Sequence, residues 1–160
     1  MSNDSENSFR ELMGTGEFMN GKRKILVVED EISLVMMMTF LLVRAGYAVE
    51  AACNVEKALW LAENIEFDLI TLDINIPGGS GFEIFRRLKQ LPHLKDTPVI
   101  FVSGCAVPEN KQRGLELGAA DFVEKPFDVS DFLSRISACL KPQNESRLTW
   151  AEKLLETQRD

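Results

Sequence analysis

The sequence predicts an α/β protein built on a doubly wound, five-stranded parallel sheet. Five short apolar runs alternate with five helical patterns, which is the order of repeated βαβ units. Right-handed crossovers between parallel strands then place helices on both faces of the sheet. Charged side chains follow three of the runs, as expected where the carboxyl ends of parallel strands open onto one crevice. The expected strands are 24–28, 47–51, 68–72, 97–102 and 121–124, and the expected helices are 32–45, 54–64, 81–90, 107–117 and 129–140.

Residues that start or stop helices support these boundaries. Gly46 and Gly118 follow the first and fourth helical patterns, where a left-handed residue commonly ends a helix. Asn54 is typical of a residue that caps the start of a helix, and Pro108 is typical of a first helical turn. The glycine-rich stretch 77–81 predicts a flexible turn.

The chain is expected to hold one folded domain with a tail at each end. Its 160 residues suit a single hydrophobic core. Residues 1–21 are polar and lack periodicity, which predicts a disordered N-terminal tail, and the stretch before Met19 resembles a cloning remnant. Residues 22–141 form the expected domain, and residues 142–160 form an expected amphipathic C-terminal tail.

The composition excludes several classes of function. The net charge is −7, whereas direct binding to nucleic acid relies on clustered Lys and Arg. The longest apolar stretch, 34–43, is far shorter than the ~20 residues that cross a bilayer, and no signal segment opens the chain. Cys53, Cys105 and Cys139 lack the spacing of a disulfide framework or a zinc site. Each is therefore expected to be a small buried side chain in a protein of the reducing cytoplasm.

Four charged side chains stand where three of the apolar runs end. Glu29 and Asp30 follow the first run, Asp73 follows the third and Lys125 follows the fifth. Because these strand ends share one edge of a parallel sheet, the four side chains are expected to meet there. Three carboxylates and one ammonium suit a divalent cation and a transferable phosphoryl group. Taken singly, each motif has an ordinary alternative, since acids also cap helices and form local turns.

Five motifs occur in order along residues 23–140. They are Val27-Val28-Glu29-Asp30-Glu31, Leu72-Asp73-Ile74-Asn75-Ile76-Pro77 with Gly81, Ser103-Gly104, Gly118-Ala119-Ala120-Asp121 and Lys125-Pro126-Phe127. In these motifs the chain resembles the receiver domain of two-component response regulators. The resemblance implies a flavodoxin-like fold with strand order 2-1-3-4-5 and Asp73 as the phosphoacceptor. It also implies a partner, a histidine kinase or a histidine phosphotransfer protein, whose phosphohistidine supplies the phosphoryl group.

The resemblance further implies Mg²⁺ as a cofactor at this edge. Its expected ligands are Asp30, Asp73 and the backbone carbonyl of Asn75, with Glu29 acting directly or through water. Mg²⁺ prefers oxygen ligands, keeps several waters and neutralises charge during phosphoryl transfer. Glu29 stands where aspartate is commoner in the family, so this ligand is one methylene longer.

The remaining site residues carry roles that the resemblance implies. Lys125 is expected to contact the phosphoryl oxygens, and Ser103 is expected to donate a hydrogen bond to one of them. Ser103 and Phe122 are the expected switch, in which the aromatic ring fills space that Ser103 vacates. The alternative for Phe122 is an ordinary core aromatic. Asn75 and Cys105 occupy positions that modulate dephosphorylation in the family, and the direction of their effect stays open.

The helical pattern over 32–44 is apolar on two faces, whereas a surface helix normally has one polar face. The expected core face consists of Leu34, Met37, Met38, Leu41 and Leu42. Met36, Phe40 and Val43, together with Val35, form a second apolar face. That face is expected to be covered by residues 142–160 or to form a partner surface, including that of a homodimer.

The sequence therefore favours a phosphoacceptor signalling domain rather than an enzyme. One alternative is a receiver taken from a longer regulator with a separate output domain, because about 20 residues after Leu140 are too few for another core. A second alternative is a phosphatase with an aspartate nucleophile, which wants another acid where this chain has Asn75. The expected partners include the phosphodonor and a downstream protein, with no direct contact to nucleic acid or membrane. The single histidine, His93, is expected on a surface loop, so the phosphodonor is expected to be another molecule.

Overall fold

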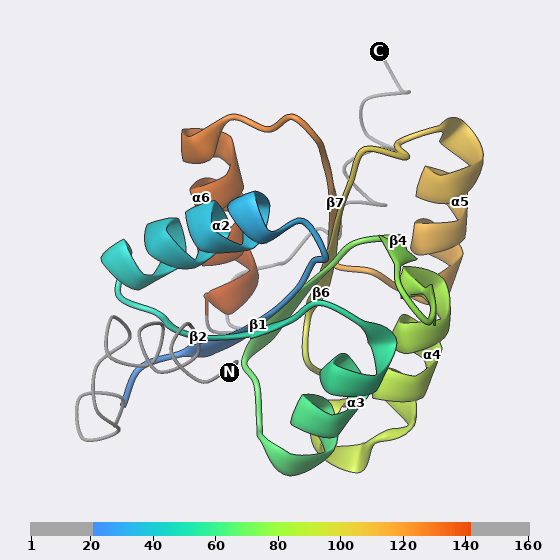
Figure 1. Ribbon diagram of the computed structural model, residues 1–160, viewed down its shortest axis with the longest axis horizontal. Helices are drawn as coiled ribbons and strands as arrows, with labels where there is room; N and C mark the ends of the chain where they lie inside the picture. The colour runs from blue at the N-terminus through green and yellow to red at the C-terminus, as the bar shows by residue number, and fades with distance from the viewer. Residues whose placement is uncertain (1–20, 142–160) are drawn as a thin grey trace, which may run out of the picture.

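The computed structural model describes residues 21–141, which form one five-stranded parallel sheet with helices on both faces (Figure 1). The sheet order is β2-β1-β3-β6-β7, and this is the predicted order 2-1-3-4-5 when the sheet strands are counted along the chain. The flavodoxin-like prediction is confirmed. The sheet strands are β1 (Lys24–Val28), β2 (Ala48–Ala52), β3 (Leu69–Leu72), β6 (Val99–Ser103) and β7 (Asp121–Glu124). The α-helices of the described part are α2 (Ile32–Arg44), α3 (Val55–Asn64), α4 (Gly81–Gln90), α5 (Pro108–Leu117) and α6 (Val129–Leu140).

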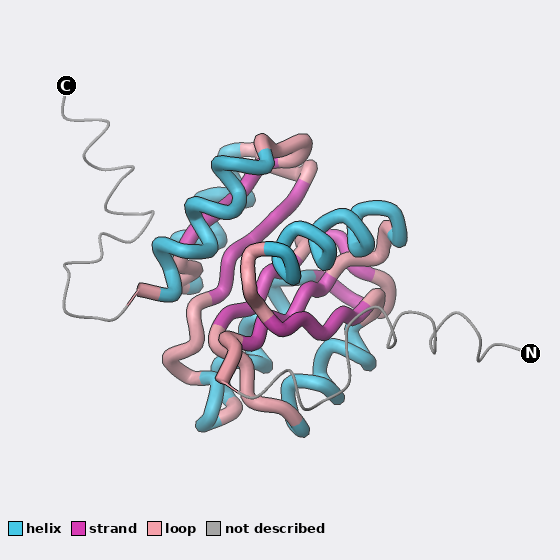
Figure 2. Tube along the Cα trace, turned by 90° about the vertical axis from the view of Figure 1, so that its left-hand side faces the viewer, coloured by secondary structure: helices cyan, strands magenta, loops and turns pink. Residues whose placement is uncertain are grey.

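The helices form two layers, one on each face of the sheet (Figures 1 and 2). We call α2 and α6 the two-helix layer, and α3, α4 and α5 the three-helix layer. Successive side chains of a strand point to opposite faces. Ile25 and Val27 accordingly pack in the two-helix layer, while Leu26 and Val28 pack in the three-helix layer. This double burial explains why the strands are almost uniformly apolar in sequence.

The helix ends agree with the signals in the sequence. The Asn54 side chain accepts a hydrogen bond from the backbone N–H of Lys57 at 2.8 Å and caps α3. Pro108 stands in the first turn of α5. Gly118 ends α5 with φ of 90°, and Gly46 follows α2 with φ of 98°, so both adopt the left-handed backbone expected of them.

Two short elements were not predicted. The glycine-rich stretch forms an antiparallel pair, β4 (Asn75–Ile76) and β5 (Gly79–Ser80), which turns at Gly78 with φ of 94°. A short 3-10 helix, η2 (Pro92–Leu94), follows α4. His93 lies in η2 and is exposed, as expected, and its Nε2 lies 2.7 Å from the backbone oxygen of Ala62.

The outer face of α2 differs in part from the prediction. Met36 and Phe40 are 58% and 60% exposed, as expected. Met37, which was assigned to the core, is 41% exposed. Val43, which was assigned to the outer face, is half-buried and packs against the core cluster that contains Leu42. After α2 the chain turns at Gly46, and Tyr47 packs against the same cluster as Val43.

The prediction of buried cysteines is wrong for Cys53, which is exposed, and Cys105 and Cys139 are only half-buried. Within residues 21–141, no helix is long and apolar enough to cross a membrane. The expected N-terminal tail and the expected amphipathic C-terminal tail lie outside the described residues.

Candidate functional site

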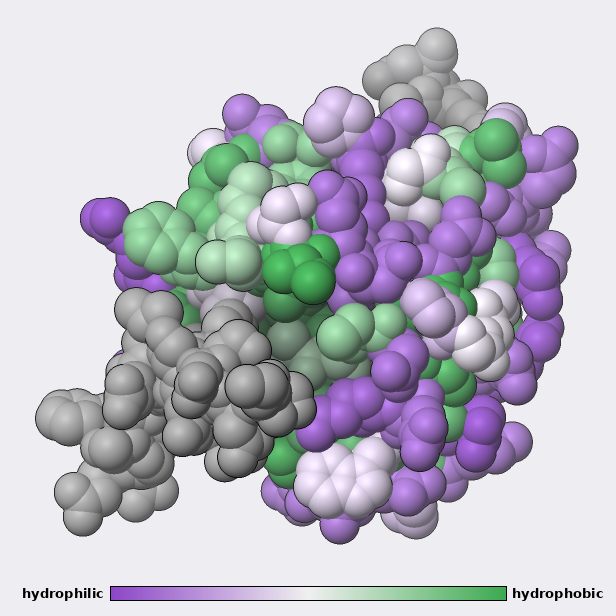
Figure 3. All heavy atoms as spheres, viewed as in Figure 1, coloured by the Kyte–Doolittle hydropathy of each residue, from purple (hydrophilic) through white to green (hydrophobic). Residues whose placement is uncertain are grey.

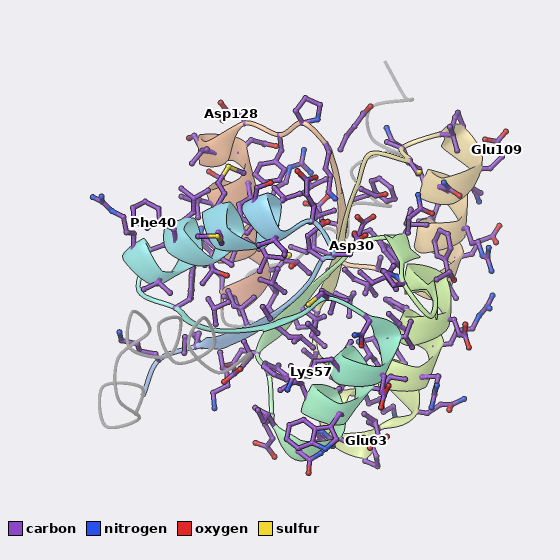
Figure 4. The ribbon with its side chains drawn as sticks, viewed as in Figure 1. Asp30, Phe40, Lys57, Glu63, Glu109 and Asp128 are labelled. Atoms are coloured by element: carbon purple, nitrogen blue, oxygen red, sulfur yellow. The ribbon has the colours of Figure 1, made fainter. Side chains whose placement is uncertain are left out.

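The predicted site residues meet at one edge of the sheet because their strands run parallel. Glu29 and Asp30 directly follow β1, Asp73 directly follows β3, and Lys125 directly follows β7. Figure 4 shows Asp30 in the loop between the end of β1 and the start of α2. Residues up to 96 positions apart in the chain therefore come into contact at the carboxyl ends of the strands.

Lys125 is the centre of the contacts at this edge. Its Nζ donates to Glu29 Oε2 at 2.5 Å and to Asp73 Oδ2 at 2.7 Å. The backbone N–H of Lys125 also donates to the carbonyl of Ser103 at 3.0 Å, and the Lys125–Pro126 peptide bond is cis. One ammonium thus links the ends of β1, β3 and β7.

Most of this charge is withdrawn from water. Glu29 is 2% exposed and Asp73 is 6% exposed. Burial raises the pKa of Glu29 above its ordinary value, and the hydrogen bond from Lys125 offsets only part of that effect. Burial alone would lower the pKa of Lys125, but its bonds to Asp73 and Glu29 outweigh burial and raise that pKa. Lys125 therefore stays protonated at neutral pH.

The acids at this edge also fit a divalent cation. Glu29, Asp30 and Asp73 each offer a carboxylate oxygen, and these oxygens lie within 4.8 Å of one another. Three carboxylates and one ammonium leave a formal charge of −2, which a divalent cation would neutralise. Asp30 is exposed, and among the described residues its carboxylate has no hydrogen bond or ion pair. Oxygen donors of this kind are the ligands that Mg²⁺ prefers.

The loops after β3 and β6 meet beside Asp73. The backbone N–H of Asn75 donates to Asp73 Oδ1 at 3.2 Å, while the Asn75 side-chain amide contacts Cys105 Sγ at 2.8 Å. The hydroxyl oxygen of Ser103 accepts from the backbone N–H of Cys105 at 3.2 Å. Ser103 is fully buried at the end of β6. The sequence predicted all four residues but not the contact between Asn75 and Cys105, because the two stand 30 positions apart.

Phe122 lies in the three-helix layer rather than in the loops of the site. Its ring is 8% exposed, and its centroid lies 6.1 Å from that of Phe101. Phe101 in turn packs against Phe82 and Phe85 of α4 at 5.2 and 5.7 Å. A Cβ at Gly114 would lie 3.3 Å from the Phe101 ring and 3.7 Å from the Phe122 ring, so this glycine lets α5 approach both.

Gly81 is a supporting residue whose role only the structure reveals. A Cβ at this position would lie 2.1 Å from the backbone oxygen of Asp73. The N–H of Gly81 donates to the carbonyl of Ile74 at 2.7 Å. The first turn of α4 therefore packs directly against the Asp73 loop, and no larger residue fits without moving one of them.

Comparisons with known proteins point to one family. Residues 25–137 match the response regulator receiver domain family. The phosphate regulon transcriptional regulatory protein PhoB of Escherichia coli is 36% identical over 119 residues, which are 74% of this chain and 52% of PhoB. The probable transcriptional regulatory protein SilR of Salmonella typhimurium is 36% identical over 133 residues, which are 81% of this chain and 58% of SilR. The chain thus spans about half the length of these curated relatives.

Solved structures agree with the sequence relatives. The chemotaxis protein CheY4 of Vibrio cholerae has a TM-score of 0.72 at 34% identity, covering 75% of this chain and 100% of that one. The receiver domain of HemR from Leptospira biflexa has a TM-score of 0.72 at 34% identity, covering 78% and 99%. A CheY-like receiver domain protein of Methanospirillum hungatei has a TM-score of 0.71 at 30% identity, covering 75% and 94%.

Proposed function

The chain belongs to the response regulator receiver domain family, and on that premise we propose that Asp73 is its phosphoacceptor. The observation that carries the proposal is the contact of Asp73 with Lys125 at 2.7 Å, at the edge where three carboxylates gather. A receiver domain works with a kinase or phosphotransfer partner, and it is a signalling domain rather than a classical enzyme. The phosphodonor here is a phosphohistidine on such a partner.

In the transfer, an oxygen of the Asp73 carboxylate forms a bond to phosphorus while the bond from phosphorus to the imidazole nitrogen breaks. The imidazole keeps the electron pair of the broken bond. Both Asp73 and the phosphoryl group are anionic, so a positive charge has to lie beside them. Lys125 supplies that charge, since its bonds to Asp73 and Glu29 keep it protonated. Phosphoryl transfer requires little covalent chemistry from the protein. The main contribution of the protein is therefore the position of the Lys125 ammonium beside Asp73.

Glu29, Asp30 and Asp73 fit Mg²⁺, with the backbone carbonyl of Asn75 as a further oxygen donor. When bound, the ion adds positive charge beside the phosphoryl oxygens. Asp30 is the exposed acid with no protein partner in the described part of the chain, so its carboxylate is free to bind a metal. Glu29 is buried and held by Lys125 and by the backbone N–H of Glu31 at 3.1 Å, so it mainly positions the ammonium.

Ser103 and Phe122 are the proposed switch. The Ser103 hydroxyl oxygen accepts from the backbone N–H of Cys105, so its O–H can still donate to a phosphoryl oxygen on Asp73. Phe122 already lies among core aromatics, so movement of the Ser103 loop would reach α4 through Phe101. The proposed output of the switch is a change in protein contacts.

The test is incubation with acetyl phosphate and Mg²⁺, followed by intact mass. We expect the protein to gain one phosphoryl group that hydroxylamine removes, as for an acyl phosphate. Asp73→Asn should abolish the gain, because an amide oxygen is a poor nucleophile. Asp96→Asn is the matched control, since Asp96 is an exposed aspartate in the loop after η2. Labelling that survives in Asp73→Asn would disprove the assignment.

A further inference from the structure

Lys89 stands in the last turn of α4, and backbone carbonyls hold its ammonium group. Its Nζ donates to the carbonyl of Leu94 at 3.4 Å, to that of Lys95 at 3.2 Å and to that of Thr97. An ammonium has three protons, so each proton has an acceptor. We call these three carbonyls the carbonyl cage. It lies between α4 and β6, at the amino ends of the strands and therefore far from the carboxylates around Asp73.

Local hydrogen bonds fold the chain so that the oxygens of the cage converge. The N–H of Leu94 donates to the carbonyl of Leu91 at 3.0 Å, and the N–H of Thr97 donates to the carbonyl of Leu94 at 3.2 Å. The Thr97 hydroxyl donates to the carbonyl of Phe67 at 3.3 Å, and Leu94 is buried in the three-helix layer. The cage is therefore shaped by contacts that do not involve Lys89.

The cage takes the place of a counter-ion. Lys89 is half-buried, and within residues 21–141 it makes no ion pair. Burial lowers the pKa of Lys89 below its ordinary value, and the charge of Asp96 offsets only part of that effect. The ring of Phe85, whose centroid lies 5.6 Å from Nζ, adds a further attraction for the cation.

The outside of the three-helix layer is largely hydrophilic where Figure 3 shows it, as expected for helices with one face in water. Lys89 differs from an ordinary lysine of such a surface because its ammonium is bound by neutral oxygens. In potassium channels, backbone carbonyls replace the hydration shell of a monovalent cation. Divalent ions in proteins instead take carboxylates, as Glu29, Asp30 and Asp73 offer at the other edge of the sheet.

We propose that the carbonyl cage is a binding site for one monovalent cation, and that the Lys89 ammonium is its built-in occupant. The class of ligand is a primary ammonium ion, because three N–H protons match three carbonyl acceptors. Free ammonium and methylammonium are the smallest ligands of this class. The inference does not depend on phosphorylation of Asp73.

The site fixes the second end of α4. The first end is fixed where Gly81 packs against the backbone oxygen of Asp73. The last turn is fixed where Lys89 binds the segment that leads into β6. A cation in the cage therefore ties α4 to the edge of the sheet opposite the phosphoacceptor.

The experiment is chemical rescue of Lys89→Ala, which removes the ammonium and its stem and leaves room in front of the cage. In tetramethylammonium chloride we expect a lower urea midpoint than for the wild type, because this ion has no N–H to donate. Methylammonium chloride at the same concentration should raise the midpoint. Above its dissociation constant, each tenfold rise in methylammonium should raise the folding equilibrium constant about tenfold. If Lys89→Ala is unfolded in tetramethylammonium, the same rescue is measured as recovery of the helical circular dichroism signal.

Two variants are matched controls. Lys111→Ala removes a lysine of α5 that pairs with Glu124 at 3.7 Å and touches no cage, so methylammonium should affect it no more than the wild type. Lys89→Met removes the charge but keeps most of the stem. It should lose stability without being rescued, because its side chain fills the space in front of the cage.

Three results would overturn the proposal. The first is a midpoint of Lys89→Ala equal to that of the wild type, which would show that the cage needs no cation. The second is an equal response of Lys89→Ala to methylammonium and tetramethylammonium up to about 1 M. The third is equal rescue of Lys89→Met or Lys111→Ala, which would show a general effect of the salt.

Discussion

The three-helix layer carries charged side chains on the outside of every helix, whereas the two-helix layer carries almost none. The exposed charges of the three-helix layer are Glu56, Lys57 and Glu63 on α3, Glu83, Arg86 and Arg87 on α4, and Glu109, Arg113 and Glu116 on α5. On α2 and α6 only Arg44 and Asp131 are both charged and exposed.

The interiors of the two layers do not differ in this way. Phe85 of α4 and Phe132 of α6 are 2% and 0% exposed, and each lies in a continuous cluster with the strands. Folding therefore does not explain the bare exterior of α2, because the core is complete without Phe40. The two layers therefore pack equally well on the sheet but differ in the side chains that they expose to solvent.

The largest expected effects test whether the two interiors are equivalent. Phe85→Ala and Phe132→Ala should each lower the free energy of unfolding by about 3–5 kcal/mol, since each leaves a cavity in a close-packed core. Urea denaturation at one protein concentration measures both. A much smaller loss in one layer would break the comparison by showing that this layer adds little to the core.

The next effect is on stability, and it compares one arginine from each layer. Arg135 of α6 donates to the buried Asp121 at 2.7 Å and to Asp131 at 2.9 Å. Arg135→Met leaves Asp121 without its counter-ion, so we expect a loss of about 1.5–3 kcal/mol in unfolding free energy.

Arg113 of α5 is the matched residue in the three-helix layer. It is exposed and lies 4.4 Å from the centre of the Phe82 ring. Arg113→Met should cost only about 0.5–1 kcal/mol, as for an exposed cation over a ring. Equal losses in the two variants would show that the arginine of the two-helix layer stabilises the fold no more than the exposed arginine of the three-helix layer.

The last effect is on metal binding rather than on stability, and it lies at the edge of the sheet where the two layers meet. Asp30→Ala should weaken Mg²⁺ binding by about tenfold, or about 1.4 kcal/mol. Glu29→Ala should weaken it less, because Glu29 is buried and held by Lys125, whereas Asp30 has no protein partner in the described residues. Calorimetry measures both affinities. A larger loss in Glu29→Ala would reverse the assigned order of the two acids.

Much of the fold and site was predictable because strong local signals agreed with one another. The apolar runs and the helix-ending glycines place the elements to within two residues. The strand-end charges predicted that Glu29, Asp73 and Lys125 come together, as they do in the structure. The β4–β5 pair escaped prediction because two residues per strand are too few to show a period. The close approach of the Gly81 backbone to the Asp73 carbonyl could not be predicted either, because spacing along the chain gives no distance between two backbone segments.

The faces of α2 were harder to assign for a different reason. A helix that is apolar all round loses the periodic signal that tells its buried stripe from its exposed one. Met37 was therefore placed inside and Val43 outside, whereas the structure has the first exposed and the second half-buried. The contact between Asn75 and Cys105 depends on two loops meeting, which no local pattern records.

Lys125 bridges the ends of β1 and β3 through one ammonium, with hydrogen bonds to Glu29 and Asp73. If Asp73 is phosphorylated, the added negative charge would draw this ammonium toward β3 and would weaken its bond to Glu29 at the end of β1. Glu29 accepts from the N–H of Glu31, the residue before α2. By linkage, any molecule that binds near this end of α2 more tightly in one of the two states would shift the phosphorylation equilibrium of Asp73 by the same free energy. The sign of that coupling would decide whether such binding favours the phosphorylated or the unphosphorylated protein.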